Sequence, residues 1–150
     1  MKNKMLIGLF LLITGISSAF ANGNEEVNDR IIRSFNKEFA GAQNVQWSNS
    51  KDFVKATFTL NEQVVYAFYS QDGTLLGATR NIVSGQLPIS LLTELKKNYS
   101  NFWIADLFEM AANDETSYYI TLEDGNYKLV LKSNANNSWE VYKKEKKQTI

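Results

Sequence analysis

Residues 52–82 read DFVKATFTLNEQVVYAFYSQDGTLLGATRNI, and this stretch decides the fold. Apolar and polar side chains alternate over 52–60, which predicts a β-strand with one buried face. Residues 64–70 are apolar on both faces, which favours a central strand, and residues 74–82 form a third strand. Asn61-Glu62 is interpreted as a tight hairpin turn, and Asp72-Gly73 is a strong hairpin signal, because glycine tolerates the positive φ that such turns need. The stretch therefore predicts an antiparallel meander.

The flanking sequence extends this meander into a longer pattern. An apolar stripe over 27–39 predicts a helix, and residues 44–48 predict a short strand before the quoted stretch. A second helix begins near Pro88, which suits a first helical turn. Four more strands are predicted over 104–110, 117–123, 126–132 and 138–143, with Asp124-Gly125 as another hairpin turn.

The predicted order is thus helix and four strands, twice. We expect an α+β fold built as a tandem repeat, with halves at about 25–83 and 86–143 of a single domain over 22–150. Both helices should pack on one face of a continuous antiparallel sheet, because each helix has a single apolar stripe to bury. The strand residues expected in that core are Val54, Phe58, Tyr66, Phe68, Ile120, Leu129, Leu131 and Trp139.

The first 21 residues have the features of a secretory signal peptide. Lys2 and Lys4 precede an apolar run from Met5 to Ile16, and Ala19-Phe20-Ala21 ends the segment with small residues around a cleavage site. The apolar run is too short to span a membrane. We expect cleavage after Ala21, a periplasmic or secreted protein, and no stable membrane insertion afterwards.

Composition excludes several function classes. The chain has no cysteine and no histidine, which removes Ser-His and Cys-His catalysis, thiol chemistry and zinc sites built on those residues. Without Lys2 and Lys4, 14 basic residues face 16 acidic ones, a net charge of −2 that gives no overall attraction to nucleic acid. We expect no enzymatic activity, no cofactor and no metal. The lysines over 143–147 are interpreted as a solvated tail rather than a binding patch.

The best candidate site is the sheet face opposite the helices. Alternation is expected to place aromatic side chains and an arginine there among small residues, a composition typical of protein recognition surfaces. The expected partner-binding residues are Phe53, Tyr69, Arg80, Tyr119 and Tyr142. Each could instead be an ordinary strand residue that packs across strands.

Four motifs in order resemble the PepSY-like family of secreted bacterial proteins, also described as β-lactamase-inhibitor-protein-like and common in Bacteroidota. The motifs are Phe39-Ala40-Gly41-Ala42-Gln43-Asn44-Val45-Gln46-Trp47, the strand and turn over 66–73, the strand over 75–80, and Leu87-Pro88. The resemblance covers residues 27–143. It implies export, a tandem helix-plus-four-strand fold and no assigned catalytic residues.

Two functions remain open. The first is a non-enzymatic exported module that binds an envelope protein or peptide on the open sheet face. The alternative is a periplasmic carrier or sensor of a small ligand, with a pocket between helices and sheet lined by Phe35, Phe58, Leu92 or Leu95. The sequence leaves the oligomeric state undetermined.

Overall fold

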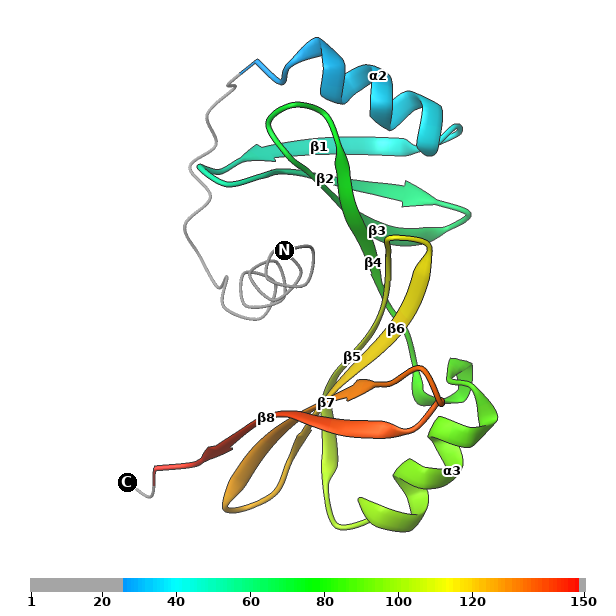
Figure 1. The fold of residues 1–150 in the computed structure, drawn as a ribbon, viewed down its shortest axis with the longest axis vertical. Helices are drawn as coiled ribbons and strands as arrows, with labels where there is room; N and C mark the ends of the chain where they lie inside the picture. The colour runs from blue at the N-terminus through cyan, green and yellow to red at the C-terminus, as the bar shows by residue number, and fades with distance from the viewer. Residues whose placement is uncertain (1–25, 149–150) are drawn as a thin grey trace.

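The computed structural model describes residues 26–148 and contains one sheet, two α-helices and a short 3-10 helix (Figure 1). The helices are α2 (Asp29–Glu38), η1 (Ser84–Gln86) and α3 (Ile89–Asn98). The strands of the first half are β1 (Gln43–Asn49), β2 (Val54–Leu60), β3 (Gln63–Tyr69) and β4 (Leu75–Asn81). Those of the second half are β5 (Trp103–Ala112), β6 (Glu115–Glu123), β7 (Tyr127–Ser133) and β8 (Trp139–Lys146).

The eight strands form one antiparallel sheet in which every strand pairs with its neighbours in the sequence, from β1 to β8. The fold is therefore α+β, and β1 and β8 are the edges of an open sheet. The sheet is strongly twisted and curved, with α2 at one end and α3 at the other, both on its outer side (Figure 1). The chain order follows the sequence prediction of a helix and four strands, then a helix and four strands.

Hairpin turns fix the register of neighbouring strands. Asn61 and Glu62 both have positive φ (48° and 65°), and Asn113 and Asp114 repeat this between β5 and β6 (53° and 62°). Two successive residues with positive φ give the twist that suits adjacent antiparallel strands. The first of these turns places Leu60 opposite Gln63, and this pairing sets the β2–β3 register as far as Val54 opposite Tyr69.

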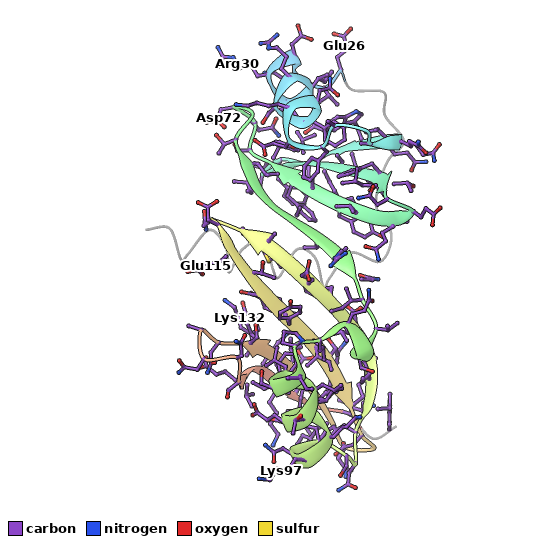
Figure 2. All side chains as sticks on the ribbon, turned by 90° about the vertical axis from the view of Figure 1, so that its right-hand side faces the viewer. Glu26, Arg30, Asp72, Lys97, Glu115 and Lys132 are labelled. Atoms are coloured by element: carbon purple, nitrogen blue, oxygen red, sulfur yellow. The ribbon has the colours of Figure 1, made fainter. Side chains whose placement is uncertain are left out.

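The first core lies between α2 and strands β1–β4. Ile31 and Phe35 of the helix pack with Val54, Ala56, Phe58, Ala67 and Tyr69 of the sheet. The ring centroids of Phe35 and Phe58 are 4.9 Å apart with planes at 87°, an edge-to-face arrangement that aromatic rings favour. The β3–β4 turn contacts the helix closely: a Cβ at Gly73 would lie 3.1 Å from Cβ of Arg30, and Figure 2 shows Arg30 beside Asp72.

The second core lies between α3 and strands β5–β8 and is mostly aliphatic. Leu91 and Leu95 of the helix pack with Leu107, Ile120, Leu122, Leu129, Leu131 and Trp139. The indole Nε1 of Trp139 donates to the carbonyl of Leu91 at 2.9 Å, and its backbone N–H donates to Glu94 at 3.1 Å. These bonds attach the start of β8 to the helix.

Both helices lie on the same face of the sheet, as the sequence predicts. Ala78 and Ile82 are separated by an even number of positions on one extended segment, so their side chains point to the same side of the sheet. Ala78 contacts the first core, and Ile82 belongs to the second. Between them Arg80 pairs with Glu109, which lies on the same side as Leu107 of the second core.

Two expected core residues lie on the opposite face. Tyr66 and Phe68 pack away from α2, whereas Val65, Ala67 and Tyr69 point toward it. The reason is that β3 is apolar on both faces, so alternation alone does not identify its buried side. The other expected core residues, from Val54 to Trp139, lie in the two helix-side cores.

The signal-peptide prediction lies outside the described residues. Within 26–148, neither helix is long and apolar enough to cross a membrane. The lysines assigned to a tail belong instead to a strand, since β8 continues to Lys146 and the backbone N–H of Lys147 still donates to Asn126.

Candidate binding face

The sheet face opposite the helices has an apolar centre, which we call the open-face cluster. Its buried members are Phe53, Phe68, Phe108, Met110, Tyr119 and Val130, and Tyr66, Leu76, Ala112 and Tyr142 pack around them half-buried. Strands β3–β8 and the residue before β2 all contribute. Among residues 26–148, no helix lies over this face (Figure 1). An antiparallel sheet covered by helices on one side has a polar second face when that face meets only water, so an apolar centre there is unusual.

Aromatic rings connect the cluster across strands. The rings of Phe108 on β5 and Tyr119 on β6 are stacked, with centroids 5.2 Å apart and an interplanar angle of 13°. Tyr142 on β8 meets Tyr119 edge-on at 6.1 Å, and Phe53 meets Phe68 at 5.6 Å. The rings therefore contact one another within each half, and the whole cluster, with Met110 and Val130, packs across both halves of the sheet.

Two lysines flank this surface, one in each half. Lys55 Nζ lies 5.6 Å from the ring centroid of Tyr66, and Lys132 Nζ lies 5.6 Å from that of Tyr119. Burial lowers the pKa of Lys55 and raises the pKa of Tyr119, because a charged form is less well solvated there. A surface of aromatic side chains beside lysines can bind the apolar groups of a partner together with its hydrogen-bond acceptors or carboxylates.

Three of the five predicted site residues share this face. Phe53, Tyr119 and Tyr142 all belong to the open-face cluster, as the alternation along β2, β6 and β8 predicts. Phe53 and Tyr119 are buried, and Tyr142 is half-buried. The structure thus brings together one residue from the first half and two from the second.

Tyr69 is on the wrong face for the predicted role. It lies opposite Val54, is fully buried in the first core, and faces α2 rather than the open face. Its hydroxyl oxygen is buried without a hydrogen-bond partner in the described residues. Burial, with the nearby Glu38 carboxylate, raises the pKa of Tyr69, so the group stays neutral.

Arg80 also faces the helix side. Its guanidinium donates through Nε to Glu109 Oε1 at 3.0 Å and through one terminal nitrogen to Gln63 at 2.6 Å. Gln63 comes from β3 and Glu109 from β5, so Arg80 connects three strands at the junction of the two halves. The predicted position of Arg80 on the open face is therefore wrong, and its guanidinium has partners on both neighbouring strands.

The residues expected to line a pocket for a small ligand pack against neighbouring side chains. Phe35 packs on Phe39, Trp47 and Phe58, with centroid distances of 5.6, 5.1 and 4.9 Å. In the second half, Leu92 and Leu95 pack into the aliphatic core. A ligand between helix and sheet would have to displace these side chains.

Phe68, Phe108 and Met110 are central to the open-face cluster, and the choice of site residues from the sequence missed them. A signal existed for Phe68: a two-residue turn at Asn61-Glu62 pairs Lys55 with Phe68, and cross-strand partners share a face. Phe108 and Met110 depend on the β4–β5 pairing, which joins strands separated by η1 and α3. No local pattern gives that register.

Comparison with known proteins finds similar proteins by structure alone. No protein-family model matches the chain, and no curated protein matches it. A BLIP-like protein from Bacteroides fragilis superposes with a TM-score of 0.69 at 16% identity, covering 89% of this chain and 90% of that one. A DUF2874 family protein from Bacteroides ovatus gives a TM-score of 0.71 at 14% identity, covering 82% and 89%.

A third similar structure comes from Bacteroides eggerthii and is provisionally described as periplasmic. It has a TM-score of 0.68 at 13% identity and covers 80% of this chain and 88% of its own. At such identities the comparison establishes the fold alone. This chain is thus an α+β protein with an open eight-stranded antiparallel sheet, and its fold is similar to that of the BLIP-like and DUF2874 family structures.

Proposed function

We propose that this chain is a non-enzymatic, exported member of the PepSY-like group, built as a tandem repeat, and that it binds a protein or peptide on its open sheet face. The observation that carries the proposal is the open-face cluster, whose half-buried Tyr66, Leu76 and Tyr142 present an apolar surface around a buried aromatic centre, on the side of the sheet that bears no described helix. Burying such a surface against a partner is favourable in proportion to the apolar area removed from water.

The composition of the face supports a protein partner. Tyrosine, phenylalanine and methionine are enriched in protein interfaces, and the half-buried Tyr66, Leu76 and Tyr142 supply accessible apolar area around a packed centre. The absence of histidine and cysteine from the chain supports a binding role over a catalytic one. The provisional periplasmic description of the Bacteroides eggerthii structure supports export.

Site-specific photo-crosslinking in the producing cell tests the proposal. A photoreactive phenylalanine analogue placed at Tyr66, Leu76 or Tyr142 should crosslink one recurring envelope protein. The matched control is Ile89, which is 83% exposed on the first turn of α3 and lies on the helix side. A partner that crosslinks equally from Ile89, or the lack of a crosslink from all three open-face positions, would contradict the proposal.

A binding measurement with the purified partner then identifies the residues. Tyr66→Ala and Tyr142→Ala should each weaken binding by about 1–3 kcal/mol, because aromatic anchors dominate interface energies. Ile89→Ala should leave the affinity unchanged. Urea unfolding of each variant separates lost binding from lost folding.

A further inference from the structure

The two edges of the sheet are chemically unlike. Strand β1 has the sequence QNVQWSN, which contains no charged residue and no proline. Strand β8, at the opposite edge, has the sequence WEVYKKEK, in which five of the eight residues are charged. Charged residues, and lysine above all, keep an edge strand from pairing with another chain. The β8 edge is therefore protected by its sequence, whereas the β1 edge is not.

The outer side of β1 presents unpaired backbone groups. Among residues 26–148, β1 pairs with β2 alone, in a ladder that is regular from Gln46 opposite Thr57 to Asn49 opposite Val54. Successive residues of an antiparallel strand direct their N–H and C=O groups to alternate sides, so about half of those groups in β1 point away from β2. An edge of this kind is a template for one more strand.

The regular part of this edge is held in place by the rest of the first half. Gln71 in the β3–β4 turn donates through Nε2 to Asn49 Oδ1 at 3.1 Å and to the carbonyl of Ser50 at 2.9 Å. The Trp47 ring packs on Phe35 of α2, with the ring centroids 5.1 Å apart. Because β1 is already ordered, little of its conformational entropy would be lost when another strand pairs with it.

The side chains of β1 suit a second copy of the same strand. Trp47 is half-buried on the helix side, so part of its ring stays accessible, and alternation directs Gln46 and Ser48 to the opposite side. In an antiparallel pair of β1 strands with a twofold axis at Trp47, the two Trp47 rings face each other and Gln46 faces Ser48 of the second copy. Aromatic and polar pairs across strands stabilise a sheet, and no like charges meet.

Pairing through β1 also stops at two copies. A twofold arrangement uses the β1 edge of both copies, so both edges that are left over are β8 edges. Those edges carry Lys143, Lys144 and Lys146, which oppose the addition of a further strand. The expected product is therefore a closed dimer rather than a growing fibre.

We propose that two copies of this chain associate through their β1 edges, antiparallel and around a twofold axis, so that their sheets become one. The open-face clusters of both copies then lie on the same side of the shared sheet. The contact uses none of the residues of the open-face cluster, so the proposal stands independently of the proposed function. A pair of seven-residue strands buries less than a standard interface, so we expect a Kd of about 10–100 µM.

Sedimentation equilibrium tests the proposal with protein purified after export, its N-terminus determined by mass spectrometry. The wild type should be dimeric at about 1 mM and monomeric at about 1 µM. Gln46→Lys should weaken association by about three- to tenfold, because it places a lysine on each side of the twofold axis. The matched control is Val141→Lys on the β8 edge, at a position 58% exposed, which should leave association unchanged. Urea unfolding checks that both variants fold.

Cysteine crosslinking adds a readout of geometry, because the chain has no cysteine of its own. Gln46→Cys, Trp47→Cys and Ser48→Cys each bring one thiol close to the proposed axis. One of the three should form an intermolecular disulfide, since only a residue that pairs with its own copy lies within disulfide distance. Val141→Cys should form none.

Three results would overturn the proposal. The first is a wild type that stays monomeric at about 1 mM. The second is an association that Val141→Lys weakens as much as Gln46→Lys does, which would move the contact away from β1. The third is the lack of a crosslink from all three β1 positions in variants that fold.

Discussion

The two halves of this molecule share an order of elements but fill their cores differently. In the first half, α2 packs through phenylalanine rings, with Phe35 in contact with Phe39, Trp47 and Phe58. In the second half, α3 packs through leucines, and Trp139 is the buried aromatic residue of that core. One arrangement of a helix on a curved meander thus accepts either rings or branched aliphatic chains, provided that the volumes match.

The halves also differ in how polar groups are used inside those cores. In the second half, both nitrogens of Trp139 have partners on α3. In the first half, the Tyr69 hydroxyl is buried beneath α2 without one in the described chain. The second core is therefore fixed by directional bonds in addition to packing, and the first core relies on packing.

Removing a ring from the first core should have the largest effect. Phe35→Ala should lower the free energy of unfolding by about 3–5 kcal/mol, because it leaves a cavity among three other aromatic rings. Urea unfolding measures the change. Ile32→Ala, on the exposed side of the same helix, is the control and should cost under about 1 kcal/mol. Equal losses of unfolding free energy in the two variants would show that the packing of aromatic rings around Phe35 adds no stability beyond that of an exposed position.

Removing the directional bond of the second core should have an intermediate effect. Trp139→Phe should lower stability by about 1–2 kcal/mol, because it loses the bond from Nε1 to Leu91 and some packing. Trp103→Phe makes the same change at an exposed site and should be nearly neutral. A Trp139→Phe protein as stable as the wild type would remove the proposed distinction between the two cores.

Removing the unpartnered hydroxyl of the first core should have the opposite sign. Tyr69→Phe should raise stability by about 1 kcal/mol, because a buried hydroxyl without a partner is unfavourable. Thermal or urea unfolding of the variant measures the change. Tyr66→Phe, on the opposite face of β3, serves as the control. A loss of stability in Tyr69→Phe would mean that a bound water satisfies the hydroxyl.

The smallest effect concerns one turn in each half, the β3–β4 turn and the β6–β7 turn, each of which is held by an aspartate carboxylate. Asp72 accepts the Ser70 hydroxyl and the backbone N–H of Thr74, and Asp124 accepts the backbone N–H groups of Asn126 and Tyr127. These bonds hold the pKa of each carboxyl below its ordinary value of 3.8. Because the folded pKa is lowered, each group stabilises the fold above pH 3.8, and this stability is lost as the pH falls through the folded pKa.

Asp72→Ala and Asp124→Ala should therefore be slightly less stable than the wild type at pH 7, and the difference should shrink on acidification below about pH 4. Unfolding midpoints measured between pH 2 and pH 7 test both turns together. Asp106→Ala, an exposed carboxylate on β5, is the control. A difference that persists unchanged at pH 2 would assign the effect to the turn backbone rather than to the charge.

The local sequence was sufficient to predict the order of the helices and strands. It was not sufficient to predict which face of β3 lies toward the helix. The eight strands and two helices are present in the predicted order, because alternation, helical stripes and Gly- or Asn-containing turns are short-range signals. The side of β3 was predicted wrongly, which misplaced Tyr69 and left Phe68 out of the site. Counting outward from the Asn61-Glu62 turn would have corrected it, since that turn pairs Phe58 with Val65 and Val54 with Tyr69.

Other features of the site depend on long-range geometry. The position of Arg80 follows from its pairing with Glu109, 29 residues away, and from an irregularity between β3 and β4. Patterns along a chain show what each residue faces only after the register between distant strands is known.

The strictly sequential order of the sheet bears on how the chain folds. Each strand pairs with the one made just before it, so six of the seven pairings close only a short turn, and only the β4–β5 pairing spans a helix. The entropy lost in closing loops is therefore small for a sheet of this size, and the contact order is low. The chain can zip up progressively from either end, and its folding rate should exceed that of a sandwich of equal length whose strands exchange between sheets.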